Sequence, residues 1–448
     1  MRQIGLTLVV ALCGCAPVTS GLPLDAGAAA RSIVARTTTP IQHVVIVVQE
    51  NQSFVHVFAG YPGADAPTMG KMYGGQQVAL TPVGFNTVDV EHSYGESIAD
   101  VDGGKMDGFS QNVAYSGGGE VGNVAVSYLR RNLVAPYWSM ARQYTLADRM
   151  FPTQHGPSWT AHIDLIAGTT SISPASALVD FPSSSPYDCW APAGTVTQTI
   201  GRGGFGTGPF PCLTQFRTMA DTLDAANVSW RFYAPPISGD TGCESCGYTW
   251  SAFGEISNVR NGPDWGKVVS PSPRVLSDIA NGELAGVTWV IPDEAYSDHA
   301  DVNATAEGPS WVSAVVNAIG RSKFWKSTAI VVVWDEWGGF YDDAVPPRLD
   351  YRGLGIRVPC LIVSPYAKRN HVSHTQYEFG SVLRFVEQVF GLPVLGTRAA
   401  GYTDGRANSI LDSFDFSQMP AAFKTIAAPY PPSTFLKAAP SGKPPDDE

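Results

Sequence analysis

Four segments of the chain are runs of consecutive apolar, mostly β-branched residues, the pattern of strands buried on both faces of a sheet. They are residues 41–48, 286–294, 329–336 and 358–367. Three other segments have helical periodicity: residues 125–150, with a break at Pro136, 309–322 and 375–392. A further helix is predicted to begin at residue 158 and to end at Gly168, because glycine commonly closes helices.

Buried strands that alternate with helices favour an α/β fold with a central, mostly parallel sheet and helices on both faces. Residues 170–275 are rich in Gly, Pro, Ser and aromatic residues, so we expect long loop insertions around a site there. Residues 39–425 are predicted to form one elaborated domain. The Pro-rich, polar tail at 426–448 is expected to be frayed.

The composition narrows the class of function. Hydrophobic residues make up 44% of the chain and charged residues 15%, which excludes a disordered chain. The net charge of −11 argues against a nucleic-acid partner, because such a protein needs a basic face. We interpret the acidity as a contribution to solubility.

The N-terminus predicts export. Residues 1–20 combine an early Arg, an apolar run and small residues around Cys15, the pattern of a secretory signal peptide, and residues 21–38 follow as a linker. The tetrapeptide LCGC also resembles a lipobox, so two alternatives stay open: a free periplasmic or extracellular protein, or one lipid-anchored at Cys15. No other run approaches the ~20 apolar residues of a membrane span, so a membrane surface would be reached through this anchor or through a substrate.

Five cysteines follow the leader. Disulfides Cys189–Cys212 and Cys243–Cys246 are expected, because each would close a short loop in an exported protein. Cys360 lies in an apolar strand and is predicted to be a buried free thiol. The CESC pair lacks the second pair or nearby His of a zinc site, so metal binding there is the less favoured alternative.

Acidic residues end two of the predicted strands. Glu50 and Asn51 follow the first strand, and Asp335 and Glu336 end the third. Buried carboxylates are costly unless they are paired or bound to a cation, and Lys and Arg are scarce nearby. Hard oxygen ligands suit Mg, Mn or Ca, and zinc if a His takes part. The alternative is that these acids cap helices or face solvent, but their equivalent positions favour a divalent metal.

Ser158 follows a Gly-Pro turn at the predicted start of a helix. The free N–H groups and the dipole of that helix would favour a phosphate there, and a metal would lower the pKa of the hydroxyl and make it a nucleophile. The local alternative is a helix N-cap.

Several histidines lie in polar surroundings. His92 and His299 suit a proton donor or a ligand, and His155 and His162 flank Ser158 in the sequence. The segment GRGGFG at 201–206 matches a dinucleotide fingerprint by its letters, but no helical pattern follows it. The chain has no G-x-S-x-G elbow, which argues against an α/β-hydrolase.

Taken together, the motifs resemble the phosphoesterase family of phosphatidylcholine-type bacterial phospholipases C, plant non-specific phospholipases C and related bacterial acid phosphatases. The resemblance covers about residues 40–420 in seven ordered blocks: HVVIVVQENQSFVHVFAG, HSYGESIADVDGGKMDGF, PTQHGPSWTAHIDLIAG, YSDHAD, WDEWGGFYDDAVPP, GIRVPCLIVSPYAK and HVSHTQYEFGSVLRFVE.

The resemblance implies an alkaline-phosphatase-like α/β core and a phosphoester hydrolase. It implies a divalent metal, with Ca, Mg, Mn and Zn left open, and a substrate that is a small phosphate ester or a phospholipid headgroup. The implied metal ligands are Glu50, Asn51, Ser158, Asp335 and Glu336. Ser158 would also be the nucleophile, with His92 and His299 as catalytic residues and His162, Asp298 and Asp343 as substrate-binding residues.

Two positions depart from the family pattern. Thr160-Ala161-His162 replaces a Pro-Asn-Arg or Pro-Asn-His segment, and Asp343 stands where the family has His. Asp343 cannot act as a cationic donor, which keeps a second hypothesis open: a weakened or inactive member that binds a phosphorylated ligand. A sulfatase is disfavoured because Ser158 does not lie in a C/S-x-P-x-R motif.

Overall fold

The apolar segments form the centre of one sheet. The computed structural model describes residues 36–236, 250–302 and 305–441. Within them, β1 (His43–Gln49) lies between β13 (Val287–Val290) and β14 (Thr328–Trp334) and is parallel to both. The order across the nine-stranded sheet is β12-β11-β13-β1-β14-β15-β6-β16, with β17 also paired to β6. The remaining strands of this sheet are β11 (Trp230–Tyr233), β12 (Val268–Val269), β15 (Val358–Val363), β6 (Thr145–Phe151), β16 (His371–Ser373) and β17 (Tyr377–Glu378).

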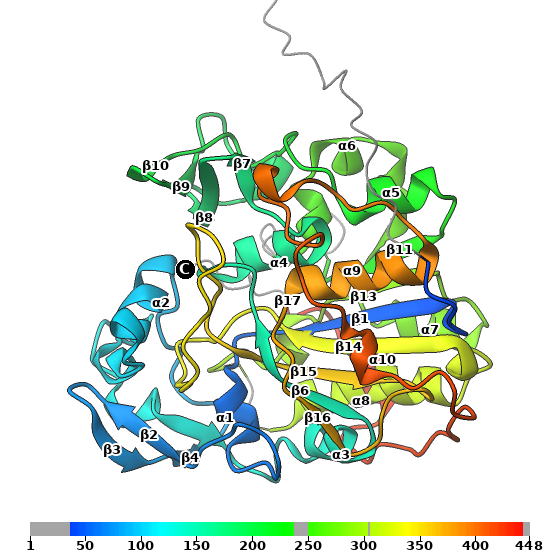
Figure 1. Ribbon diagram of the computed structural model, residues 1–448, viewed down its shortest axis with the longest axis horizontal. Coiled ribbons are helices and arrows are strands. Elements are labelled where there is room, and N and C mark those ends of the chain that lie inside the picture. Colours follow the sequence, from blue (N-terminus) through cyan, green and yellow to red (C-terminus); the bar gives the residue numbers. More distant parts are fainter. Residues whose placement is uncertain (1–35, 237–249, 303–304, 442–448) are drawn as a thin grey trace, which may run out of the picture.

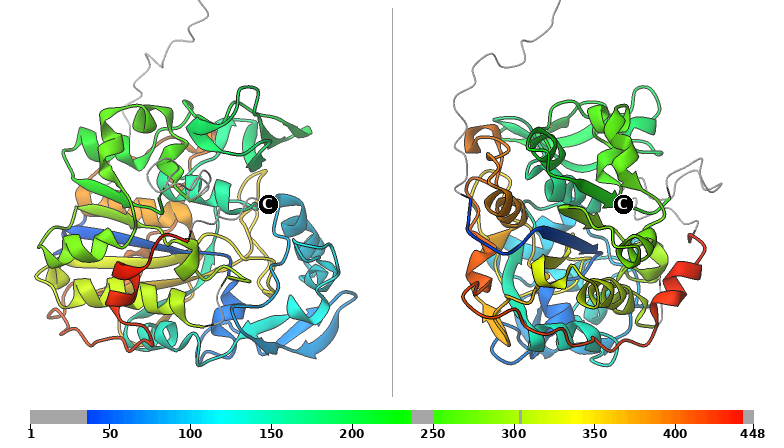
Figure 2. Two further views of the ribbon diagram at one scale, coloured as in Figure 1. Left: turned by 180° about the vertical axis from the view of Figure 1, so that it is seen from behind. Right: turned by 90° about the vertical axis from the view of Figure 1, so that its right-hand side faces the viewer.

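Helices cover both faces of this sheet, which confirms the predicted α/β class. On one face α4 (Ser158–Ala167) packs against α9 (Phe379–Phe390). On the other, α8 (Glu307–Gly320) packs against α3 (Ala135–Gln143) and α7 (Arg274–Ala280). The edge-on view in Figure 2 shows α9 in orange and α8 in yellow-green on opposite sides of the strands.

One central strand runs against the others. β15 is antiparallel to β14 and to β6. A parallel return needs a long crossover, usually a helix, and the connection at 335–357 contains no helix. The chain therefore turns back along the edge of β14 and re-enters the sheet in the opposite direction.

The helix predicted at 125–150 is confirmed only for residues 135–143 and is wrong on both sides of them. The segment forms β5 (Ser127–Leu129), α3 and the strand β6. Pro136 lies in the first turn of α3, where its missing N–H costs no hydrogen bond. Residues Thr145–Phe151 form a strand instead of a helix because β15 and β16 lie on either side of them and take up their backbone hydrogen bonds.

The region 170–275 is more regular than predicted. It contains a second, antiparallel sheet at the top of Figure 1, in the order β10-β9-β8-β7, and it also contributes helices and two strands of the central sheet. The four strands are β7 (Ser171–Ser173), β8 (Ser176–Pro182), β9 (Thr197–Gly201) and β10 (Gly204–Thr207); the helices include α5 (Met219–Ala225) and α6 (Ser257–Arg260). GRGGFG forms the β9–β10 hairpin, with no helix after it.

The cysteine predictions are confirmed where the structure describes them. Cys189 and Cys212 form a disulfide with an S–S distance of 2.08 Å, and Cys360 is a buried free thiol. Cys243 and Cys246, like the leader with Cys15, lie outside the described residues.

The tail is not frayed as far as residue 441. It forms α10 (Pro432–Lys437), and the Phe435 side chain packs on Tyr296 and Trp311 with ring centroids 5.4 Å away in both cases. The backbone N–H of Ser441 donates to Asp293. The packing of Phe435 thus holds the tail on the domain despite the polar composition of the tail. Among the described helices, none has the length and apolar character needed to cross a membrane.

Candidate active site

The acidic strand ends lie side by side. Parallel pairing puts Gln49 opposite Trp334, so the next residues, Glu50 and Asp335, leave the same edge of the sheet together. The N–H of Asn51 donates to Asp335 Oδ1 over 2.9 Å. Glu50, Asn51, Asp335 and Glu336 are all fully buried. The expectation that these acids share one edge is confirmed, and their exposure to solvent is excluded.

Two glycines let the strand ends approach. Gly338 and Gly339 have φ values of 63° and 73°, in the left-handed region. A Cβ on Gly338 would lie 2.1 Å from the Asn51 carbonyl oxygen. Asn51 itself has φ of 61°, a strained conformation that is held by these contacts. The turn also brings the Gly338 N–H to Glu336 Oε2, at 2.7 Å.

Glu50, Asp335, His162 and Ser158 form what we call the strand-end cluster. His162 Nε2 lies 3.2 Å from Glu50 Oε2 and 3.8 Å from Asp335 Oδ2. One ligand atom each from Glu50, His162 and Asp335 falls within 4.8 Å of the other two. Ser158 is hydrogen-bonded to Asp335. The cluster therefore combines a potential nucleophile with three potential ligands of a cation.

The electrostatics of the cluster favour a cation. Burial raises the pKa of Asp335 well above its usual value, and the charge of Glu50 raises it further. His162 and the Ser158 hydroxyl oppose this shift. Within the described part of the chain, the groups with the largest effects on this pKa include no Lys or Arg. Burying two carboxylates beside one imidazole is unfavourable unless more positive charge arrives.

The first turn of α4 presents Ser158 to this charge. The helix begins at Ser158 and is closed by Gly168 in the left-handed conformation, as predicted. The N-cap position belongs to Pro157, so Ser158 is not the cap. At Gly156, a Cβ would lie 2.7 Å from Thr160 Oγ1, so a tight turn precedes the helix. The hydroxyl thus lies beside the free N–H groups at the N-terminus of the helix.

A second group joins Asn51, His92 and Glu336. His92 Nδ1–H donates to the Val90 carbonyl over 2.6 Å, so the Nε2 of the neutral ring accepts from the Asn51 amide at 2.8 Å. Glu336 Oε1 is 3.9 Å from the same Nε2. The Asn51 and Glu336 side chains are thus engaged with His92 and with a turn, while Glu50 and Asp335 face His162.

His299 lies next to this group. Its ring centroid is 6.1 Å from that of His92, and its Nδ1–H donates to the Ala300 carbonyl over 2.9 Å. Trp250 lies 6.5 Å from both His299 and His162, measured between ring centroids. The structure therefore gathers all three predicted histidines around the strand ends.

A family model matches residues 41–393, most of the chain, and it describes the phosphoesterase family. The chain belongs to the phosphoesterase family. The phosphoesterase is accordingly a hydrolase of phosphoric ester bonds, and the resemblance noted in the sequence is confirmed.

Its curated relatives include bacterial and plant enzymes. Phospholipase C A of Mycobacterium tuberculosis strain H37Rv is 25% identical, covering 85% of this chain and 78% of the relative. Non-specific phospholipase C6 of Arabidopsis thaliana is 21% identical over 79% of this chain and 69% of the relative. A solved protein in the alkaline phosphatase superfamily from Vibrio parahaemolyticus aligns with a TM-score of 0.40 and 10% identity, over 86% of this chain and 74% of that chain.

The phosphoesterase holds Asp298 and Asp343 by contacts outside the strand-end cluster. Asp298 Oδ2 accepts hydrogen bonds from the Tyr137 hydroxyl at 2.7 Å and from Trp334 Nε1 at 3.0 Å, and burial raises its pKa to about 7. Asp343 accepts from Arg357 Nη2 at 3.0 Å. Their predicted roles as substrate-binding residues stay predictions.

Three residues near the site were not assigned these positions from the sequence. His162 was expected to bind substrate, but its position four residues after Ser158 places it on the same helical face and so beside the acids. Arg357 just precedes a buried strand, and its partners could not be read from spacing. Trp250 carries no sequence signal that would place it between two histidines.

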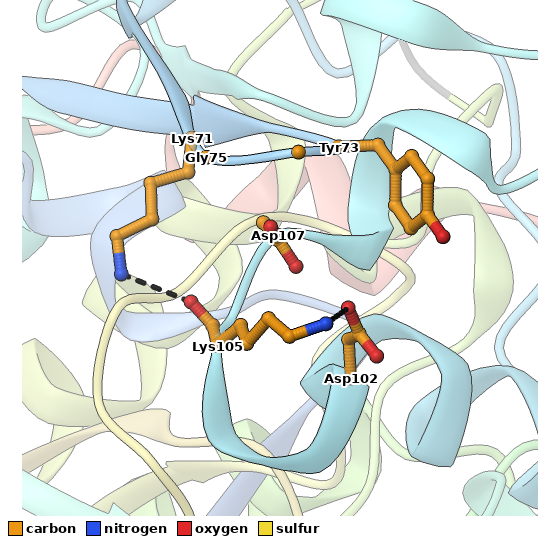
Figure 3. Close-up of a pocket in the computed structure, with 7 residues that line it drawn as sticks. Lys71, Tyr73, Gly75, Asp102, Lys105 and Asp107 are labelled. Carbon is orange, nitrogen blue, oxygen red and sulfur yellow. Dashed lines mark hydrogen bonds and ion pairs between the residues drawn. The ribbon is translucent and has the colours of Figure 1, made fainter.

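A surface pocket of about 520 Å³ is lined by other residues (Figure 3). It is formed by the hairpin of β2 (Met69–Met72) and β3 (Gln76–Ala79) and by the turn after α2 (Tyr94–Val101). Lys105 pairs with Asp102 at 2.7 Å, and Lys71 donates to the Lys105 carbonyl over 2.9 Å. The charges drawn there are largely matched, and no predicted site residue lines the pocket.

Proposed function

We propose that the protein is an exported, metal-dependent phosphoesterase that works through a phosphoserine on Ser158. The observation that carries this proposal is the strand-end cluster: Glu50, His162 and Asp335 within 4.8 Å of one another, with Ser158 hydrogen-bonded to Asp335.

Glu50, His162 and Asp335 fit a divalent metal. They offer two carboxylate oxygens and one imidazole nitrogen, a donor set that suits zinc or manganese and does not exclude calcium or magnesium. When bound, the metal would balance the negative charge of the cluster and lower the pKa of a nearby hydroxyl. Asn51 and Glu336 stand one residue further along each strand and would support this site through His92.

Ser158 is positioned to attack phosphorus. Its Oγ would form a bond to phosphorus as the bond to the leaving alcohol breaks, and the N–H groups at the start of α4 would hold the phosphoryl oxygens. His92 or His299, when protonated on Nε2, would give the alcohol its proton. Water would then cleave the phosphoserine, releasing phosphate or a phosphomonoester and restoring the serine hydroxyl.

The substrate is proposed to be a phosphodiester of the phospholipid class, with a phosphomonoester as the alternative. Support comes from the relatives, which are named phospholipases C. Such a substrate would bring the protein to a membrane surface. Export is supported by the leader pattern and by the Cys189–Cys212 disulfide, since disulfides persist in oxidising compartments.

The test compares p-nitrophenyl phosphorylcholine with p-nitrophenyl phosphate, each with and without chelator. We expect faster release from the diester, loss with chelator and recovery on adding metal. No turnover of either substrate by the metal-loaded protein would leave ligand binding as the function. The main support for that alternative was Asp343, whose bond to Arg357 now gives it a structural contact.

A further inference from the structure

A second pair of buried carboxylates lies behind the nucleophile helix. Asp188 begins a short 3₁₀ helix (Asp188–Trp190), and Glu255 directly follows another (Ala252–Gly254). Both side chains are fully buried. Neither belongs to the strand-end cluster, and the mechanism uses neither.

Contacts from three segments bring the two acids together. Asp188 Oδ1 accepts from Trp159 Nε1 of α4 at 3.4 Å. A Cβ on Gly254 would lie 2.9 Å from Asp188 Oδ2, so the carboxylate rests on the backbone beside Glu255. The Glu255 carbonyl accepts from the N–H of Leu213, next to the Cys189–Cys212 disulfide. Burial raises the pKa of Glu255, and the charge of Asp188 raises it further.

The protein supplies little to balance these charges. Among the described residues, Asp188 Oδ2 and both oxygens of Glu255 have no hydrogen-bond partner. The hydroxyl of Ser251, four residues before Glu255 and also fully buried, has none either. Among the residues that the structure describes, no Lys or Arg is one of the groups that shift the pKa of either acid.

The protein contains another pair of buried acids, Glu387 and Asp404. Burial and the charge of Asp404 raise the pKa of Glu387 to about 10. Asp404 Oδ2 accepts a hydrogen bond from the N–H of Leu395 at 2.7 Å. This pair offers a comparison, because it is the same kind of buried acid pair in another part of the chain.

We propose that Asp188 and Glu255 bind a divalent cation, with calcium as the ion, at a site separate from the strand-end cluster. Asp188, Glu255 and Ser251 offer oxygen atoms without a partner among the described residues, and oxygen is the ligand that calcium prefers. Cys189 and Cys212 are joined in a disulfide and cannot act as thiolate ligands. Two carboxylates would match the charge of one such ion. The ion would tie the segments at 188–190 and 251–255 to α4, which carries Ser158.

The test uses the full chain carrying Asp335→Asn, which removes a ligand of the strand-end cluster, after treatment with chelator. We expect this protein to bind about one calcium ion per chain by isothermal titration and to gain thermal stability from it. Adding Glu255→Gln or Asp188→Asn should abolish both effects. Glu387→Gln is the matched control, because it alters the other buried pair and should leave calcium binding unchanged.

Terbium luminescence gives a second measurement that requires no change to the carboxylates. Terbium at this site would be excited through the indoles of Trp159 and Trp190, since both lie beside the Asp188 carboxylate. Replacing both with Phe should lower its emission several-fold while calcium still competes it away. Absence of calcium binding in the folded Asp335→Asn protein would overturn the proposal. So would binding that persists unchanged in Glu255→Gln and Asp188→Asn. If either of these variants fails to fold, emission that the double Trp159→Phe, Trp190→Phe variant leaves unchanged overturns it equally.

Discussion

Two groups of acids on one stretch of chain have opposite surroundings. Asp342 accepts from Arg357 Nε at 3.0 Å and Asp343 from Arg357 Nη2 at 3.0 Å, so a single buried guanidinium pairs with both acids and offsets part of their negative charge. Asp335, seven residues before Asp342, is buried beside Glu50 and faces the His162 imidazole, the Ser158 hydroxyl and the Asn51 N–H. The comparison teaches that the partner of a buried carboxylate, rather than its sequence neighbours, separates an acid that is paired within the fold from one that we propose to bind a cation.

We call Asp342 and Asp343, which pair with Arg357, the matched acids, and Asp335 and Glu50 the unmatched acids. The matched acids also support the position of the unmatched ones. Asp342 Oδ2 accepts from the N–H of Val55 at 3.2 Å, in α1 (Phe54–Phe58), which closely follows Asn51. Arg357 further donates to the Asp148 carbonyl and lies 4.5 Å from the Phe54 ring centroid. The ion pairs thus hold the chain on both sides of the strand-end cluster.

The largest effect is expected on the unmatched side. Ser158→Ala should lower the rate of p-nitrophenyl phosphorylcholine hydrolysis at least about 1,000-fold, because no other hydroxyl replaces the nucleophile. Ser313→Ala, a buried serine of α8, is the matched control and should retain activity. Comparable activity in Ser158→Ala, measured at equal metal content, would remove Ser158 from the mechanism.

On the matched side, Arg357→Met should destabilise the fold by about 3 to 5 kcal/mol. The substitution leaves Asp342 buried without its countercharge. Urea unfolding measures the change, with the exposed Arg149→Met as control. A loss below about 1 kcal/mol would mean that Asp342 does not depend on this ion pair.

Asp298 is an intermediate case, since its partners are neutral donors. Burial raises its pKa from 3.8 to about 7, so between these values the unfolded chain loses a proton that the folded chain keeps. Stability should therefore fall as pH rises from about 4 to 7, by roughly 2 to 4 kcal/mol. Asp298→Asn should lack this part of the fall. If the unfolding free energies of the wild type and of Asp298→Asn changed with pH in the same way, the raised pKa of Asp298 would be contradicted.

Asp335→Asn should have the opposite sign to Arg357→Met. In metal-free protein it should raise the unfolding free energy by at least about 1 kcal/mol, because one pKa unit corresponds to about 1.4 kcal/mol and asparagine keeps an oxygen for the Asn51 N–H. Activity should be lost at the same time. A less stable, metal-free Asp335→Asn protein would show that the carboxylate is balanced within the fold.

Asp343→Asn should have the smallest effect, a loss of at most about 1 kcal/mol. Its ion pair is partly open to solvent, where such pairs contribute little. Asp343→His restores the residue of the family pattern. A large gain in hydrolysis with His, but not with Asn, would show that this position acts on the substrate as well as on Arg357.

The sequence predicted the parts of the site that follow from strand and helix periods. Glu50 and Asp335 were expected at one sheet edge because each ends a buried run, and Ser158 at a helix start because of the Gly-Pro turn before it. The orientation of β15 and the strand β6 were missed, since both depend on which strands lie alongside. The contact of Arg357 with Asp343 depends on a tertiary ion pair, which no local pattern encodes.

The most direct test of the account measures hydrolysis of p-nitrophenyl phosphorylcholine by the chelator-treated protein before and after stepwise addition of zinc, manganese, calcium or magnesium. Metal content per chain is followed in the same samples, with Asp335→Asn in parallel. The account predicts that activity is lost with the metal, returns in proportion to the ion that the wild type regains, and does not return in Asp335→Asn. Full activity in the metal-free wild type would contradict it.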